Sequence, residues 1–172
     1  MNRSKFIHLS VLGGLAIAGL ESCSTSNSLT KKFVKDPLKM SLSREFVFWA
    51  HSNLKEVKTL TQEHPHLVNA TVDWGDGDFE SALGAASHVG NKDIANYLME
   101  QGARADIFTL AMLGKEQLVI QQIEAFPKTI NLIGPHGFTL LHHAEIGVKS
   151  QKLIDYLKNK GLTEKFIETY KK

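Results

Sequence analysis

Cysteine is nearly absent from this 172-residue chain, which has a single one at Cys23. One cysteine excludes a disulfide within the chain and a zinc site built from several thiolates. Strong charge is also absent, because 20 Lys and Arg against 18 Asp and Glu leave a formal net charge of +2. These charges are scattered rather than gathered into a basic stripe, so nucleic acid is not an expected partner.

The chain also lacks the short motifs that mark common active sites. A nucleophile elbow, a G-x-G-x-x-G phosphate loop and an H-E-x-x-H metalloprotease helix are all missing. Because catalytic triads are assembled in space rather than in sequence, this absence argues only weakly against an enzyme. The sequence predicts no catalytic residue, no cofactor and no metal site.

The apolar runs of the sequence are short, and the longest one lies near the N-terminus. Residues 6–20 are almost entirely apolar and follow two basic residues, Arg3 and Lys5. A helix of about fifteen residues spans roughly 22 Å, which is too short for a ~30 Å hydrocarbon core. A basic start followed by a short apolar stretch predicts a signal peptide over residues 1–22.

The end of this segment, Leu20-Glu21-Ser22-Cys23, resembles the lipobox of bacterial lipoproteins, although Glu21 departs from the usual small residue. The resemblance implies lipidation of Cys23 and a place in the bacterial cell envelope, either periplasmic or lipid-anchored to a membrane. Simple export with cleavage after Ala18, or an uncleaved anchor, are the alternatives. Residues 23–42 are rich in Ser, Thr and Lys and predict a flexible tether.

Beyond the tether, related segments recur along the chain. Residues 81–106 and 139–162 both run from a small or hydroxyl residue through Leu and Ala to a Gly, and then continue with apolar residues at helical spacing. Shorter versions occupy residues 48–69 and 109–131. This pattern predicts helix–turn–helix units, whose turns lie at Asn53, Gly90, Gly114 and Gly147.

These units resemble the ankyrin repeat, and residues 137–144, GFTLLHHA, are similar to the family signature G-x-T-P-L-H-x-A. The resemblance implies an all-α fold, an ankyrin-type helical solenoid of three to four helix–turn–helix units over residues 43–162. It further implies that His142 hydrogen-bonds the backbone between repeats, while His143 is expected to be exposed. Thr163 as an N-cap, with Phe166, Ile167 and Tyr170 on one face, predicts a C-terminal capping helix over residues 163–172.

The acidic stretch between the first two units, residues 73–80, does not match a calcium loop in either possible register. It lies in an enlarged loop, where Gly75 and Gly77 favour turns. Asp78 is expected to cap the following helix, with Glu80 in its first turn. His51 and His88 lie near the predicted inter-helix turns and receive no role.

The resemblance implies a protein–protein interaction module with no catalytic activity of its own and an unidentified protein partner. Ankyrin proteins bind through loop tips and the first helices. The residues expected to contact the partner are therefore Trp74, Asp76, Asp78, Phe79, Glu80, Pro135, His136 and Phe138. The alternatives are an envelope metal-dependent hydrolase with an unrecognised site, and an accessory lipoprotein that associates with itself.

Overall fold

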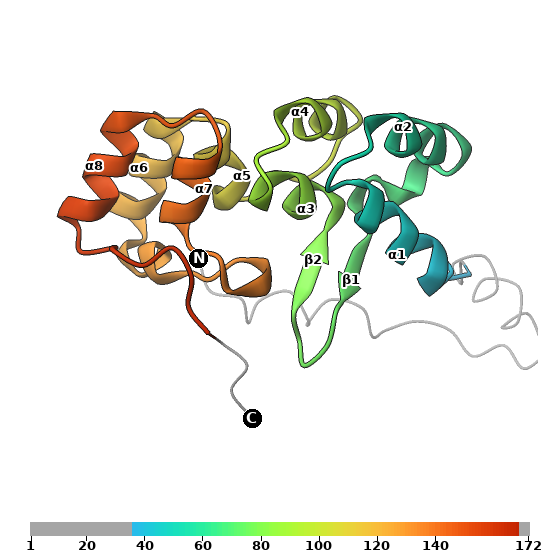
Figure 1. Ribbon diagram of the computed structural model, residues 1–172, viewed down its shortest axis with the longest axis horizontal. Coiled ribbons are helices and arrows are strands. Elements are labelled where there is room, and N and C mark those ends of the chain that lie inside the picture. The colour runs from blue at the N-terminus through green and yellow to red at the C-terminus, as the bar shows by residue number, and fades with distance from the viewer. Residues whose placement is uncertain (1–35, 169–172) are drawn as a thin grey trace, which may run out of the picture. The chain divides into compact units, whose positions relative to one another are not determined.

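Eight α-helices in four consecutive pairs make up most of the part of the chain that the structure describes (Figure 1). The structure is a computed structural model and describes residues 36–168. The first helices of the pairs are α1 (Met40–Trp49), α3 (Ala82–His88), α5 (Ile107–Met112) and α7 (Leu140–Ile146). The second helices are α2 (Leu54–Glu63), α4 (Lys92–Glu100), α6 (Glu116–Ala125) and α8 (Gln151–Asn159). The prediction of a mostly helical protein is confirmed.

Three short 3-10 helices occupy the connections between pairs in the same part of the chain. They are η2 (Pro65–Asn69), η3 (Pro127–Asn131) and η4 (Pro135–Gly137). The first two follow α2 and α6 and each begin with a proline, whose fixed φ suits the first position of a helix.

Each helix packs against its pair mate, and successive pairs pack against one another. The first helices contact one another in succession, α1 with α3, α3 with α5 and α5 with α7, and α3 also reaches α7. Among the second helices, α2 contacts α4 and α6 contacts α8. The first helices can approach closely because they meet through small buried residues, namely Ala82, Ala85, Ala86, Ala111 and Ala144.

The predicted turn positions do separate the two helices of each pair. Gly90 and Gly114 adopt φ values of +75° and +67°, which an L residue rarely takes. Asn53 instead caps α2, its side-chain oxygen accepting a hydrogen bond from Glu56 N at 3.2 Å. Gly147 lies against the carbonyl oxygen of Met112, where a Cβ atom would overlap.

The enlarged loop is a β-hairpin, so the prediction of an all-α fold is incomplete. Strand β1 (Thr71–Asp73) pairs antiparallel with β2 (Phe79–Ser81), and Val72 lies opposite Glu80. The glycines of the intervening tip let the chain reverse tightly, and the flanking residues then pair as strands. The hairpin projects from the row of first helices, between α1 and α3 (Figure 1).

The predicted capping helix is wrong over residues 163–168, which have no helical structure. This segment pairs instead with the chain before α7, where Thr139 N donates to Lys165 O at 3.0 Å and Ile167 N donates to Gly137 O at 2.9 Å. Phe138 and Phe166 form an isolated antiparallel bridge. Backbone groups of this segment therefore bond to residues 137–139 and not to one another, as they would in a helix.

Several predictions fall on residues that the structure does not describe. They are the signal peptide over residues 1–22, Cys23, the tether up to residue 35 and the final residues 169–172. The last residues of the predicted tether are described, and α1 begins within them, at Met40. Within residues 36–168, no helix has both the length and the apolar character needed to cross a bilayer.

Candidate functional site at the hairpin and the 134–138 loop

The tip of the hairpin is organised by one carboxylate. Asp73 Oδ1 accepts hydrogen bonds from Gly75 N at 2.9 Å and Gly77 N at 3.2 Å. Asp76 at the tip has a positive φ of 54°, which Asp tolerates better than most residues. The interpretation of this stretch as a turn is confirmed. The expected helix cap is wrong, because Ser81 and not Asp78 caps α3, its Oγ accepting from Gly84 N at 3.0 Å.

Asp78 instead connects the hairpin to the loop that precedes α7. It accepts a hydrogen bond from His136 N on Oδ1 at 2.9 Å, and His136 Nδ1 lies 2.6 Å from its Oδ2. An ionised carboxylate only accepts, so His136 carries its proton on Nδ1 and presents Nε2 on the other side of the ring. Two segments that are 58 residues apart in sequence are thereby held together.

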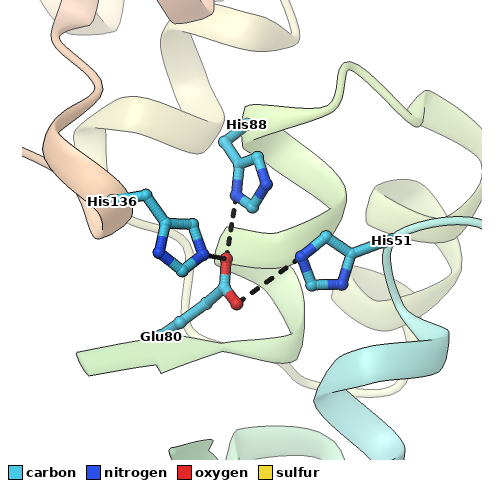
Figure 2. Close-up of side chains that lie close together, drawn as sticks. All are labelled: His51, Glu80, His88 and His136. Carbon is cyan, nitrogen blue, oxygen red and sulfur yellow. Dashed lines mark ion pairs between the residues drawn. The ribbon is translucent and has the colours of Figure 1, made fainter. Parts of the chain in front are cut away.

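Glu80 is completely buried beneath this junction, and three imidazoles surround its carboxylate (Figure 2). His88 Nδ1 lies 2.8 Å and His136 Nε2 lies 3.4 Å from Oε1, while His51 Nε2 lies 3.6 Å from Oε2. Trp74 Nε1 donates a hydrogen bond to Oε2 at 2.7 Å. We call His51, Glu80, His88 and His136 the histidine–glutamate cluster.

Each member of the cluster comes from a different element. His51 follows α1, Glu80 is in β2, His88 ends α3 and His136 is in η4. His51 is fixed by its own helix, because its Nδ1 lies 3.1 Å from Val47 O and 3.0 Å from Phe48 O. A carbonyl only accepts, so the proton of His51 is on Nδ1 and its Nε2 is left to face Glu80.

Two atoms of the cluster are buried without a hydrogen bond. These are Glu80 Oε1 and His88 Nδ1, which form an ion pair at 2.8 Å but do not meet the geometry of a hydrogen bond. Buried polar atoms almost always form hydrogen bonds, so a buried ion pair without one requires an explanation. Both side chains are at least nine-tenths buried, with exposed fractions of 0% for Glu80 and 8% for His88.

The surroundings of Glu80 favour its charged form. Burial raises the pKa of this carboxyl, but the ion pair with His88 and the hydrogen bond from Trp74 together lower it. The net pKa lies below its usual value, so Glu80 is a carboxylate at neutral pH. Three imidazoles and one carboxylate are donor groups that suit a divalent transition metal.

Two further histidines lie behind the cluster on α7. His142 Nε2 donates to His88 O at 2.7 Å, so the expected hydrogen bond from this imidazole to the backbone of another helix pair is confirmed. The expectation for His143 is wrong, because this side chain is fully buried. Its Nδ1 donates to Thr139 O at 2.8 Å in the turn below, where α7 begins. Burial lowers the pKa of His143 to about 4, so its ring is neutral at pH 7.

The structure brings most of the predicted contact residues together but gives several of them internal roles. Glu80 is buried, which removes it from any contact surface, and Trp74 is half-buried with its indole bound to Glu80. Phe138 is half-buried and stacks on His142, with ring centroids 4.1 Å apart. Two of the predicted residues are exposed, Asp76 at the tip and Phe79, whose exposed fraction is 62%.

Sequence reasoning missed the cluster itself. Glu80 and His136 were assigned to the contact surface, and His51 and His88 received no role. The four residues have no metal-motif spacing, because they come from four separate elements and meet only after the helix pairs pack. The one available signal was that His51 and His88 both lie at the ends of first helices.

Comparisons with known proteins do not assign the chain to a family. No protein-family model matches it, and no curated protein matches it with significance.

Proposed function

We propose that residues 43–162 form an ankyrin-type helical solenoid of four helix–turn–helix units. The support is the succession of paired helices with a cap or glycine at each predicted turn, and the bond from His142 to the backbone of α3. In such arrays each pair is too thin to bury its own apolar face, so stacking supplies the core. The function that this architecture favours is binding of another protein, without catalytic activity.

One observation carries this proposal: loops from two different helix pairs are held in one surface. The Asp78–His136 contact fixes the hairpin beside the 134–138 loop. We call Asp76, Asp78, Phe79, Pro135 and Phe138 the loop surface. A hollow of about 390 Å³ lies against it, lined by residues that include Phe79, Pro135 and Asp106.

The side chains that line the hollow indicate which kind of partner segment it would bind. Phe79 and Pro135 offer apolar contact, and Asp106 offers an exposed carboxylate at the same place. Asp76 adds an exposed negative charge at the tip of the hairpin. We therefore propose a partner segment that presents an apolar side chain next to Lys or Arg, with Phe79 as the principal anchor.

The proposed location is the bacterial cell envelope, with the protein tethered through lipidated Cys23. The support is the lipobox-like Leu20-Glu21-Ser22-Cys23 and the apolar run before it. Metabolic labelling with a fatty acid should mark the wild-type chain and not Cys23→Ala. Equal labelling of both would reject the anchor and leave the binding proposal unaffected.

Binding at the loop surface is tested by placing a photoreactive residue at position 79 in the full chain, in its native envelope. Position 126 is the matched control, since Phe126 is 68% exposed on a different part of the chain. A heterologous protein should be crosslinked from position 79 only, and Phe79→Ala should weaken its capture by more than about tenfold, whereas Phe126→Ala should not.

Two results would contradict the proposal. Crosslinking of the same protein from both positions would show that contact is not specific to the loop surface. A product that contains only a second copy of the chain would support self-association instead.

A further inference from the structure

We propose that the histidine–glutamate cluster is a binding site for one divalent transition-metal ion, with Zn²⁺ the ion that fits best. The inference is independent of the protein-binding proposal. His51, Glu80, His88 and His136 each offer one ligand atom, and all four of these atoms lie within 4.8 Å of one another. Figure 2 shows the three rings directed at the carboxylate from three sides.

The spacing of the donor atoms is close to what zinc requires. With Zn–N and Zn–O bonds near 2.0–2.2 Å, two ligands of a tetrahedral ion are separated by about 3.3 Å. The three nitrogens lie 2.8, 3.4 and 3.6 Å from the nearest oxygen of Glu80, on both sides of that value. Rotations of the four side chains, without movement of the elements that hold them, would bring the atoms to ligand distance.

The histidines are held in the manner of metal ligands. A metal-binding imidazole normally donates its other N–H to a carboxylate or a carbonyl, which fixes the tautomer and directs the free nitrogen at the ion. His136 does this with Asp78, and His51 does it with the carbonyls at the end of α1. In both rings Nε2 is then the nitrogen that faces Glu80.

Two buried atoms without a hydrogen bond point to a third partner. Glu80 Oε1 and His88 Nδ1 lie 2.8 Å apart as an ion pair, but without hydrogen-bond geometry. A cation bound by both atoms would satisfy the two of them at once. Without it, the cluster would be a buried carboxylate neutralised by protonated histidine, and that arrangement is the competing explanation.

The donor set also indicates the kind of site. Three imidazole nitrogens with one carboxylate favour Zn²⁺ and its neighbours over Ca²⁺ or Mg²⁺, which prefer oxygen ligands. Four protein ligands close a tetrahedral shell, as in structural zinc sites, whereas catalytic ones leave a position for water. The ion would therefore fix the hairpin and the 134–138 loop to the first helices.

The site is tested with the full chain carrying Cys23→Ala, so that the thiol contributes nothing. The protein is freed of metal with a chelator, and Zn²⁺ is added in competition with a chromophoric chelator. We expect one Zn²⁺ per chain and a raised melting temperature. Co²⁺ in place of Zn²⁺ should give the intense visible bands of four-coordinate geometry.

Matched variants locate the ligands. His136→Gln replaces a side chain that is one-third exposed, so the fold should be retained, and it should lower Zn²⁺ affinity by more than about 100-fold. Asp78→Asn, which removes the carboxylate that orients His136 and keeps an amide oxygen for the bond from His136 N, should lower it by about 10–100-fold. His64→Gln removes an exposed histidine outside the cluster and should leave affinity unchanged.

Glu80→Gln serves as a second ligand variant, with circular dichroism as the check on folding. Absence of stoichiometric binding in the parent chain would overturn the proposal. Equal affinity of the parent, His136→Gln and His64→Gln would also overturn it. Either result would establish the cluster as a buried ion pair.

Discussion

At the residue scale, the histidines of this chain differ in how deeply they are buried. His64 and His66 are exposed at the end of α2, whereas His143 is fully buried among apolar residues of α5 and α7. His143 packs against the ring of Phe108, with centroids 5.0 Å apart, and donates only to Thr139 O. A proton on its second nitrogen would be buried and unpaired.

This burial predicts a loss of stability in mild acid. The pKa of His143 falls from an ordinary 6.5 to about 4, chiefly because of burial, and the hydrogen bond to Thr139 O only partly opposes this fall. Between these pH values the unfolded chain binds the proton and the folded chain does not. The free energy of unfolding should therefore fall by about 3 kcal/mol as the pH drops from 6.5 to 4.

The measurement is urea unfolding at a series of pH values in the presence of a chelator. His143→Gln cannot titrate and should lose that share of the pH dependence, while His66→Gln at the surface should keep it. An unchanged pH profile in His143→Gln would show that other groups cause the acid sensitivity.

At the element scale, the second helices differ in how they begin. Asn53 and Asn91 occupy the position before α2 and α4, and each accepts a hydrogen bond from the backbone N–H three residues later, at 3.2 Å. Ser150 does the same for α8 at 3.4 Å. The corresponding residue before α6 is Lys115, which has no such oxygen and forms no cap hydrogen bond. The start of α6 is therefore the least satisfied of the four.

Restoring the missing cap should stabilise the protein. Lys115→Asn should raise the free energy of unfolding by about 0.5–1 kcal/mol, because its side chain can accept from the first turn of α6. The matched variant that removes a cap is Asn91→Ala, which should lower the free energy of unfolding by about 1 kcal/mol. Chemical denaturation of both variants gives the two values, and an unaffected or less stable Lys115→Asn would show that the local backbone does not permit the cap.

At the scale of the whole molecule, the third and fourth helix pairs approach each other closely at a glycine. Gly147 ends α7, and a Cβ atom there would overlap the carbonyl oxygen of Met112 in α5. The next residue, Val148, donates its N–H to that same oxygen at 2.9 Å. The third and fourth helix pairs are therefore in direct contact through their backbones at this point.

Gly147→Ala should force these two pairs apart and cost more than about 3 kcal/mol of stability. Gly102→Ala is the control, because Gly102 has open space around it and only its φ of +91° opposes a side chain, at about 1 kcal/mol. Thermal unfolding of the two variants compares the costs. A similar small loss in both would show that the junction can relax.

The features that could be predicted from the sequence are those that depend on residues close together in the chain. Helix pairs and their turns were predictable, because apolar spacing and residues such as Gly90 and Asn53 act locally. The hairpin was predicted only as a loop, since three-residue strands leave too short a pattern to recognise. The cluster was not predictable, because the burial of Glu80 arises only when α1, α3 and the 134–138 loop come together.

The Asp78–His136 contact limits where a helix pair can be inserted into the chain or deleted from it. Repeat arrays usually tolerate gain or loss of a unit, because each unit touches only its neighbours. Here the α5–α6 pair lies in the sequence between two partners that must still meet, and α3 already reaches past α5 to α7. Deleting or duplicating that pair would shift one partner out of reach, so the helix pairs between Asp78 and His136 are not interchangeable.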